Sequence, residues 1–80
     1  MKSRPVVLVV EDEPVLRASM VRGLSKIPSV DVLDAGSVSD ATRVITESKP
    51  VVLVSDLDLP DGTGVDLINV LDCQDLKVPI

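Results

Sequence analysis

The sequence has 80 residues, with 8 basic and 13 acidic side chains and a net charge of −5. This length predicts one domain over residues 1–80, because domains usually run from about 50 to 250 residues. The apolar fraction of 45% is too high for a disordered tail, and no apolar run reaches the ~18 residues that a membrane span needs. The acidic balance and the lack of aromatic residues argue against nucleic-acid binding, and the lack of histidine argues against zinc and Ser–His chemistry. We therefore expect an acidic, cytoplasmic globular domain whose abundant chemistry is carboxylate.

Runs of valine predict the strands. The sequence holds 16 valines, and they cluster in Val6–Val10 and in Val51–Ser55. Continuous β-branched runs are typical of strands that are buried on both faces of a parallel sheet. Between them, Val30 and Val32 alternate with Asp31, which predicts a shorter and more exposed strand.

The first helix is expected to begin at Pro14 and to end at Pro28, because proline fits the first turn of a helix and stops one that reaches it. Its inner face is expected to carry four apolar residues at helical spacing: Leu16, Met20, Leu24 and Ile27.

Two further helices follow. Ser37 is expected to cap the second one and Lys49–Pro50 to close it, and the third is expected to start near Gly64. The second helix should bury Ala41, Val44 and Ile45, and the third should bury Val65, Leu67, Ile68 and Leu71. Residues 56–63 are expected to form a loop, residues 72–75 a connection, and residues 76–80 the beginning of a strand.

The alternation of strands and helices predicts an α/β fold with a parallel sheet. The three strand runs are centred near residues 8, 32 and 53, so each strand–helix unit takes 21 to 24 residues. The sequence thus holds three units and the start of a fourth.

Acidic residues stand where two of the strands end. Glu11 and Asp12 follow the first strand, and Asp56 follows the third. Ligands of open parallel sheets bind beyond the carboxyl ends of the strands, and hard oxygen donors suit Mg²⁺. Spacing alone leaves a metal or phosphate site about as well supported as helix capping or ion pairing. Capping or exposure to solvent is the favoured interpretation for four other acids: Glu13, Asp40, Asp61 and Asp66.

Two motifs narrow these alternatives. The segment Val-Val-Leu-Val-Val-Glu-Asp-Glu-Pro and the segment Val-Ser-Asp-Leu-Asp-Leu-Pro-Asp-Gly-Thr-Gly place Asp12 and Asp56 44 residues apart. Together they resemble the response-regulator receiver domain, the CheY-like family, over essentially the whole chain. The resemblance implies a flavodoxin-like parallel sheet in the strand order 2-1-3-4-5 with helices on both faces. The sequence ends as the fourth strand of that order begins.

The resemblance also implies a site. Asp56 matches the phosphoacceptor, which takes a phosphoryl group from a histidine kinase or phosphotransfer protein. Glu11 and Asp12 match the acidic pair that holds Mg²⁺ together with Asp56, and Asp58 matches the position whose backbone carbonyl completes the metal shell. Two further positions match the turn after the phosphoacceptor: Pro60 and Gly64.

Two functional positions of the family, a Ser or Thr after the fourth strand and a Lys after the fifth, have no match. The four lysines are expected at the opposite end of the sheet or outside it: Lys2, Lys26, Lys49 and Lys77. Arg17 is close enough to reach an acid or phosphate, but a surface ion pair is the favoured interpretation. Without the family lysine, phosphorylation at Asp56 is expected to be slow or absent in the isolated chain.

A receiver module of a phosphorelay is therefore the leading hypothesis for the function. The alternative is a receiver-derived dimerisation or protein-interaction module that takes no phosphate. An exposed edge of the third strand would favour a homodimer through that strand, the third helix and residues 76–80. Cys73 could lie near that interface, although a buried or solvated thiol is the favoured interpretation. A magnesium-dependent phosphatase is disfavoured, because 80 residues leave little room for substrate loops.

Overall fold

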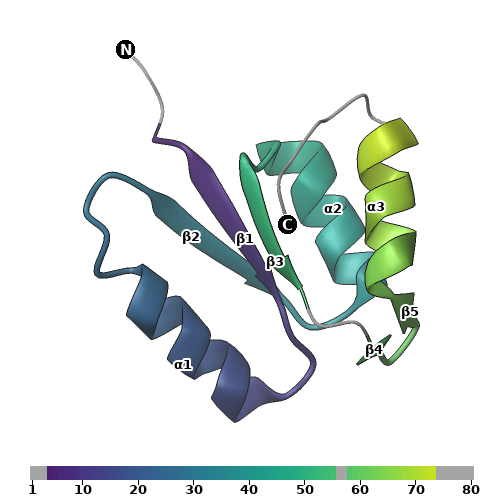
Figure 1. The fold of residues 1–80 in the computed structure, drawn as a ribbon, viewed down its shortest axis with the longest axis horizontal. Coiled ribbons are helices and arrows are strands. Elements are labelled where there is room, and N and C mark those ends of the chain that lie inside the picture. The colour runs from purple at the N-terminus through teal and green to yellow at the C-terminus, as the bar shows by residue number, and fades with distance from the viewer. Residues whose placement is uncertain (1–3, 56–57, 74–80) are drawn as a thin grey trace.

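A computed structural model describes residues 4–55 and 58–73, the last two without their side chains. The three longer strands alternate with the helices along the chain as the sequence predicts (Figure 1). The elements are β1 (Val6–Val10), α1 (Pro14–Leu24), β2 (Asp31–Ala35), α2 (Val38–Ser48), β3 (Val52–Ser55), β4 (Asp58–Leu59), β5 (Gly62–Thr63) and α3 (Gly64–Cys73). The strand predicted within residues 76–80 lies outside the described residues.

The three longer strands form one parallel sheet in the order β2-β1-β3. Val7 is level with Val32 of β2 and with Val52 of β3, so the register is uniform across the sheet. The central place of β1 explains why its valine run has the greatest apolar density, because a central strand needs apolar residues on both faces. The predicted parallel α/β fold and the beginning of its strand order are confirmed.

The main core lies between the sheet and helices α2 and α3, which are on the same side of it (Figure 1). Leu8 and Val10 point to this side from β1, because side chains alternate between the faces of a strand. The remaining buried members are Ala35, Ala41, Ile45, Leu53, Leu59, Leu67 and Leu71.

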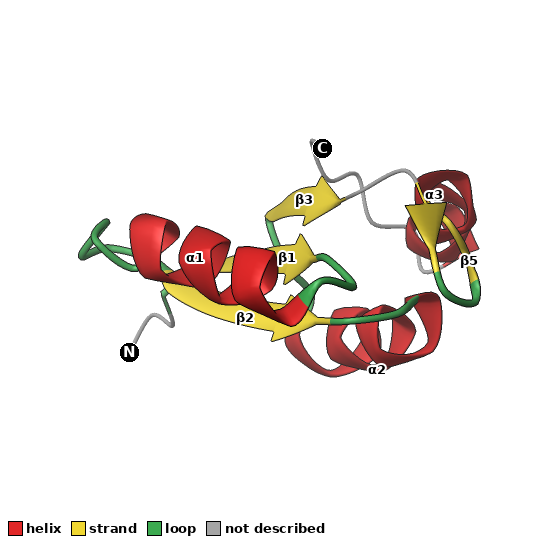
Figure 2. Ribbon diagram, turned by 90° about the horizontal axis from the view of Figure 1, so that it is seen from below, coloured by secondary structure: helices red, strands yellow, loops and turns green. Residues whose placement is uncertain are grey.

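The other face of the sheet is covered by α1, which lies against β1 and β2 (Figure 2). Val7 and Val9 are buried there, although no residue of α1 is itself buried. Because α1 lies mainly beside β1 and β2, Val52 and Val54 of β3 are only half-buried. The prediction that β3 is buried on both faces is therefore wrong.

Helix α1 is shorter and more exposed than the sequence predicts. It ends at Leu24, where the Ser25 N–H donates to the carbonyl of Val21 at 2.9 Å. Ile27 follows in a turn and is 46% exposed, and Leu16 in the helix is 49% exposed. The predicted inner face is thus wrong at both residues. The helix stops one turn before Pro28 because proline disfavours helical backbone in the residue that precedes it.

Helix α2 follows its prediction closely. The Ser37 hydroxyl accepts a hydrogen bond from the Asp40 N–H at 3.1 Å, which is the expected cap. Ala41 and Ile45 are fully buried. The helix ends at Ser48 and is capped by Lys49, which adopts left-handed backbone with φ 48° and donates its N–H to the carbonyl of Ile45.

Helix α3 buries half of its predicted face. Leu67 and Leu71 lie in the core, whereas Val65 is 58% and Ile68 is 41% exposed, so the prediction is wrong for these two. The helix continues to Cys73, beyond the start of the predicted connection. The described helices have 10 or 11 residues, and none of them is long and apolar enough to cross a membrane.

Candidate functional site

The carboxyl ends of the three parallel strands form one edge of the sheet. Val10, Ala35 and Ser55 are level at this edge, because β1 pairs in register with β2 and with β3. The next residues in the chain are Glu11 after β1 and Asp56 after β3. Asp56, the predicted phosphoacceptor, lies outside the described residues.

Glu11 is the one charged residue that is buried within the described part of the chain, at 6% exposure. Its N–H donates to the carbonyl of Ala35 at 3.0 Å, which continues the pairing of β1 with β2. Its Oε2 accepts a hydrogen bond from the Glu13 N–H at 3.1 Å. Burial of a carboxylate is costly unless hydrogen bonds or a cation compensate it. The buried carboxylate of Glu11 therefore favours a cation or a polar group beside it.

Asp12 and Asp58, the other predicted contributors to the metal shell, are exposed. Carboxylate and carbonyl oxygens are the hard donors that Mg²⁺ prefers, so the chemistry of this set fits that ion. Among residues 4–55 and 58–73, no three acidic side chains gather closely enough to hold a metal ion. The complete metal site includes Asp56 and therefore remains a prediction.

Arg17 connects the turn after β1 to β2. Its Nη1 donates to the backbone carbonyl of Glu11 at 3.0 Å, and its Nε lies 3.3 Å from Oδ2 of Asp34. The predicted surface ion pair is confirmed, and the bond to Glu11 is an additional contact. Arg17, which lies in α1, thus holds the backbone at Glu11, the first residue of the acidic pair Glu11 and Asp12.

Residues 58–63, for which the sequence predicts a loop, form a small antiparallel hairpin of β4 and β5. Asp58 pairs with Thr63, and Leu59 pairs with Gly62. The sequence carried one signal for this structure, an apolar Leu59 directly before a Pro-Asp turn pair. Leu59 is 9% exposed and belongs to the main core, so it fixes the hairpin to the body of the domain.

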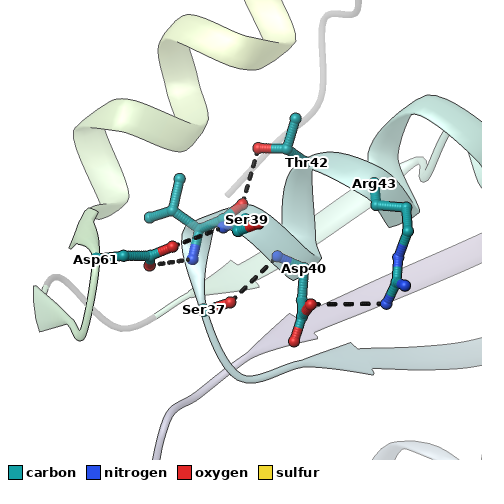
Figure 3. Close-up of polar contacts among 7 residues, drawn as sticks. Ser37, Ser39, Asp40, Thr42, Arg43 and Asp61 are labelled. Atoms are coloured by element: carbon teal, nitrogen blue, oxygen red, sulfur yellow. Dashed lines mark hydrogen bonds and ion pairs between the residues drawn. The ribbon is translucent and has the colours of Figure 1, made fainter.

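Asp61, at the tip of this hairpin, caps helix α2. Its Oδ1 accepts the Val38 N–H at 2.7 Å, and its Oδ2 accepts the Ser39 N–H at 3.0 Å (Figure 3). These two hydrogen bonds hold the pKa of the Asp61 carboxyl below its ordinary value of 3.8, because they favour the charged form. The predicted capping role is confirmed, but the capped helix precedes Asp61 by 23 residues in the sequence.

The base of the hairpin is joined to helix α3. The Thr63 N–H donates to Oδ2 of Asp66 at 2.9 Å, and the Asp66 N–H donates to the Thr63 hydroxyl at 3.4 Å. This reciprocal arrangement is a capping box, and it confirms the role expected of Asp66. The expectations for Glu13 and Asp40 are also confirmed: Glu13 accepts the Val15 N–H at 3.2 Å, and Asp40 is an exposed partner of Arg43.

Comparison with known proteins gives the class of this fold. The model of the response regulator receiver domain family matches residues 7–80. The DNA-binding transcriptional activator DevR/DosR of Mycobacterium tuberculosis is 39% identical over 71 residues, which are 88% of this chain and 30% of that protein. The chain thus spans about a third of the length of the curated relatives it matches.

Solved receiver domains have the same fold. The signal receiver domain of a LuxO repressor protein from Vibrio parahaemolyticus superposes with a TM-score of 0.82 at 33% identity, covering 95% of this chain and 58% of that one. The non-phosphorylated HemR receiver domain from Leptospira biflexa superposes with a TM-score of 0.78 at 29% identity. The match covers 90% of this chain and 57% of that one.

The parallel sheet with an acidic pair after its central strand is that of a flavodoxin-like α/β signalling domain. The chain belongs to the response regulator receiver domain family of two-component systems. Receiver domains are signalling domains that interact with histidine kinases or phosphotransfer proteins, and they generally bind Mg²⁺ at the phosphorylation site.

Proposed function

We propose that this chain accepts a phosphoryl group on Asp56, with Mg²⁺ held by Glu11, Asp12, Asp56 and the backbone carbonyl of Asp58. The observation that carries this proposal is the register of the sheet. Ser55 and Val10 are paired residues of adjacent strands, so β1 and β3 end at the same edge of the sheet, and Asp56 is next in the sequence after Ser55. In a parallel sheet this edge is where ligands bind.

The reaction is a transfer between two proteins. A carboxylate oxygen of Asp56 forms a bond to phosphorus, and the bond between phosphorus and the imidazole nitrogen of the donor histidine breaks. The electron pair of that bond returns to the imidazole, and the product on this chain is an acyl phosphate. When bound, Mg²⁺ neutralises the crowded oxygens of such a site.

The residues around the site support this role. Glu11 is held in a buried position by its backbone bond to Ala35, and Arg17 donates to the carbonyl of Glu11. Both contacts fix the start of the loop that carries Asp12. A carboxylate that is positioned in advance binds a cation without a further cost in ordering.

Intact mass after incubation with acetyl phosphate and Mg²⁺ tests the proposal. Because the family lysine has no match in the sequence, we expect the unaltered chain to gain one phosphoryl group slowly, and we expect none on the Asp56→Ala variant. Asp31→Ala is the control, because Asp31 is an exposed acid at the start of β2, the end opposite the proposed site, and the proposed metal shell does not include it. Labelling that persists in Asp56→Ala would place the reaction elsewhere. A complete absence of labelling would favour the alternative role described next.

Self-association without phosphorylation is the second candidate function. In the described part of the chain, β3 pairs with β1 and with no other strand. Val51 beside it is 48% exposed, and Val65 and Ile68 on α3 are also exposed. Exposed apolar side chains beside a strand and on a neighbouring helix favour association with a second copy.

Light scattering measures this association directly. We expect a dimer for the unaltered chain and a monomer for the double variant Val65→Asp/Ile68→Asp. Val15→Asp, on the exposed surface of α1, is the control that should leave the dimer intact. A monomer at micromolar concentration in the unaltered chain would exclude the second candidate.

A further inference from the structure

The hairpin that follows Asp56 is held at three points, and each point belongs to a different part of the domain. Leu59 is buried in the core, Thr63 is bonded to α3 through Asp66, and Asp61 is bonded to α2. The Leu59 attachment is apolar, and the Thr63 attachment joins residues that are three positions apart in the sequence. The Asp61 attachment is a pair of charge-assisted hydrogen bonds to an element that lies more than twenty residues away.

We propose that Asp61 is a positioning residue for the metal site: its two hydrogen bonds to α2 hold the hairpin so that the Asp58 carbonyl is correctly placed. The inference rests on the proposed function, because it concerns the same metal shell. Asp58 and Asp61 belong to one hairpin of two-residue strands, so the tip and the carbonyl of the first strand move together. A residue outside a metal shell that orients a ligand contributes to metal affinity through that ligand.

The contact between hairpin and helix is also close in space. A side-chain carbon at Gly62 would stand 2.5 Å from Oδ2 of Asp66 and 2.9 Å from a methyl carbon of Val38. Only glycine fits at this position without displacing the hairpin from α2 or disturbing Asp66. Gly62 therefore allows the approach that brings Asp61 within 3.0 Å of two backbone donors of the helix.

Ser37 provides a matched comparison, because it caps the same helix without touching the hairpin. Its hydroxyl accepts the Asp40 N–H, whereas Asp61 accepts the N–H groups of Val38 and Ser39 (Figure 3). Loss of either side chain leaves the first turn of α2 with unpaired donors. Only loss of the Asp61 side chain also removes one of the three attachments of the hairpin.

Magnesium titrations of the full chain, followed by amide chemical shifts, test the proposal. We expect Asp61→Ala to weaken Mg²⁺ binding about tenfold, which is the lower end of the range for residues that support metal ligands. Asp61→Asn retains one acceptor oxygen and should have intermediate affinity. Ser37→Ala should lower stability while leaving the Mg²⁺ affinity unchanged.

Hydrogen exchange provides a second measurement, which is made on the unaltered chain. Because coupling between two sites is reciprocal, Mg²⁺ should slow exchange of the Val38 and Ser39 amides in the unaltered chain by a factor similar to the loss of affinity in Asp61→Ala. The Asp40 amide, which is bonded to Ser37, serves as the internal control. Its exchange should respond less.

The outcomes separate the two proposals. An Mg²⁺ affinity that is the same in Asp61→Ala and in the unaltered chain would overturn the positioning role alone. Equal weakening by Asp61→Ala and Ser37→Ala would also overturn it, since the effect would then arise from the stability of α2. If Mg²⁺ did not change the exchange rates of the Val38 and Ser39 amides, the positioning role would be contradicted as well. An unaltered chain that binds no Mg²⁺ would overturn the proposed metal site and this inference together.

Discussion

The guanidinium group of Arg17 occupies the space beside Gly36. A side-chain carbon at Gly36 would stand 2.5 Å from Nη1 of Arg17, the atom that donates to the carbonyl of Glu11. Gly36 directly follows β2, and Arg17 also pairs with Asp34 in that strand. The absence of a side chain at residue 36 therefore allows Arg17 to tie α1 both to β2 and to the turn after β1.

Gly36→Ala is expected to lower the free energy of unfolding by about 1 kcal/mol, because Arg17 must give up a hydrogen bond to make room. Gly23→Ala is the control: a side-chain carbon there meets nothing within 4 Å, and alanine favours the helix by up to about 1 kcal/mol. Urea denaturation measures both. In the Arg17→Ala variant, Gly36→Ala should no longer lower the free energy of unfolding. If the effects of the two substitutions on that free energy simply added in the double variant, this account would be contradicted.

The pH dependence of stability should change when Asp61 loses its charge. The folded-state pKa of Asp61 lies below 3.8, so its carboxylate stabilises the fold above that pH and the stabilisation is lost as the pH falls toward the folded-state value. The Asp61→Asn variant should therefore lose less stability on acidification than the unaltered chain. Urea midpoints measured at about pH 6 and about pH 3 provide the comparison.

Ser37→Ala is the control for this experiment, because it removes a cap of the same helix without removing a titratable group. Its stability should be lower than that of the unaltered chain by a similar amount at both pH values. An acid dependence of Asp61→Asn identical to that of the unaltered chain would show that the carboxylate does not titrate as described.

Neighbouring residues of α3 should differ sharply in their contribution to stability. Leu67 is fully buried and Ile68 is 41% exposed. Leu67→Ala is expected to cost about 2–5 kcal/mol, since it leaves a cavity in the core, whereas Ile68→Ala should cost about 1 kcal/mol or less. Thermal unfolding followed by circular dichroism measures both. Similar costs for the two variants would contradict the orientation of α3.

Relief of backbone strain should stabilise the end of α2. Lys49 has φ 48°, a left-handed conformation that side chains disfavour and glycine adopts readily. Lys49→Gly is expected to raise the free energy of unfolding by about 0.5 kcal/mol. Lys26→Gly is the control, because Lys26 lies in an exposed turn without positive φ and glycine there should be neutral or slightly destabilising. A Lys49→Gly variant less stable than the Lys26→Gly variant would contradict the argument.

Much of the fold could be predicted from the sequence because the residues that start, form or end an element are close together in the chain. The valine run of β1, the Ser37 cap and the proline after Lys49 each depend on residues within a few positions of one another. The exposed faces of α1 and α3 were predicted incorrectly, because periodicity says which residues share a face and not how much of that face meets a partner. Leu16 and Ile68 have the correct spacing and remain exposed.

For the candidate site, too, one part could be predicted from the sequence and another part could not. The edge of the sheet beside Glu11 followed from strand order, since the carboxyl ends of parallel strands meet at one edge. The bond from Arg17 to the Glu11 carbonyl and the bonds from Asp61 to α2 could not be predicted, because they depend on how separate elements approach each other. Side-chain type identified Asp61 as a capping residue, but only packing determined which helix it caps.

The distance along the chain between Val38 and Asp61 has a consequence for the order of folding. Ser37 can cap the first turn of α2 as soon as that segment forms, because its partner is three residues away. The bonds to Asp61 close a loop of more than twenty residues that contains α2 and β3, so they carry a larger entropic cost of loop closure. We expect the amino end of α2 to fray in early folding species and to gain full protection only in the last steps of assembly.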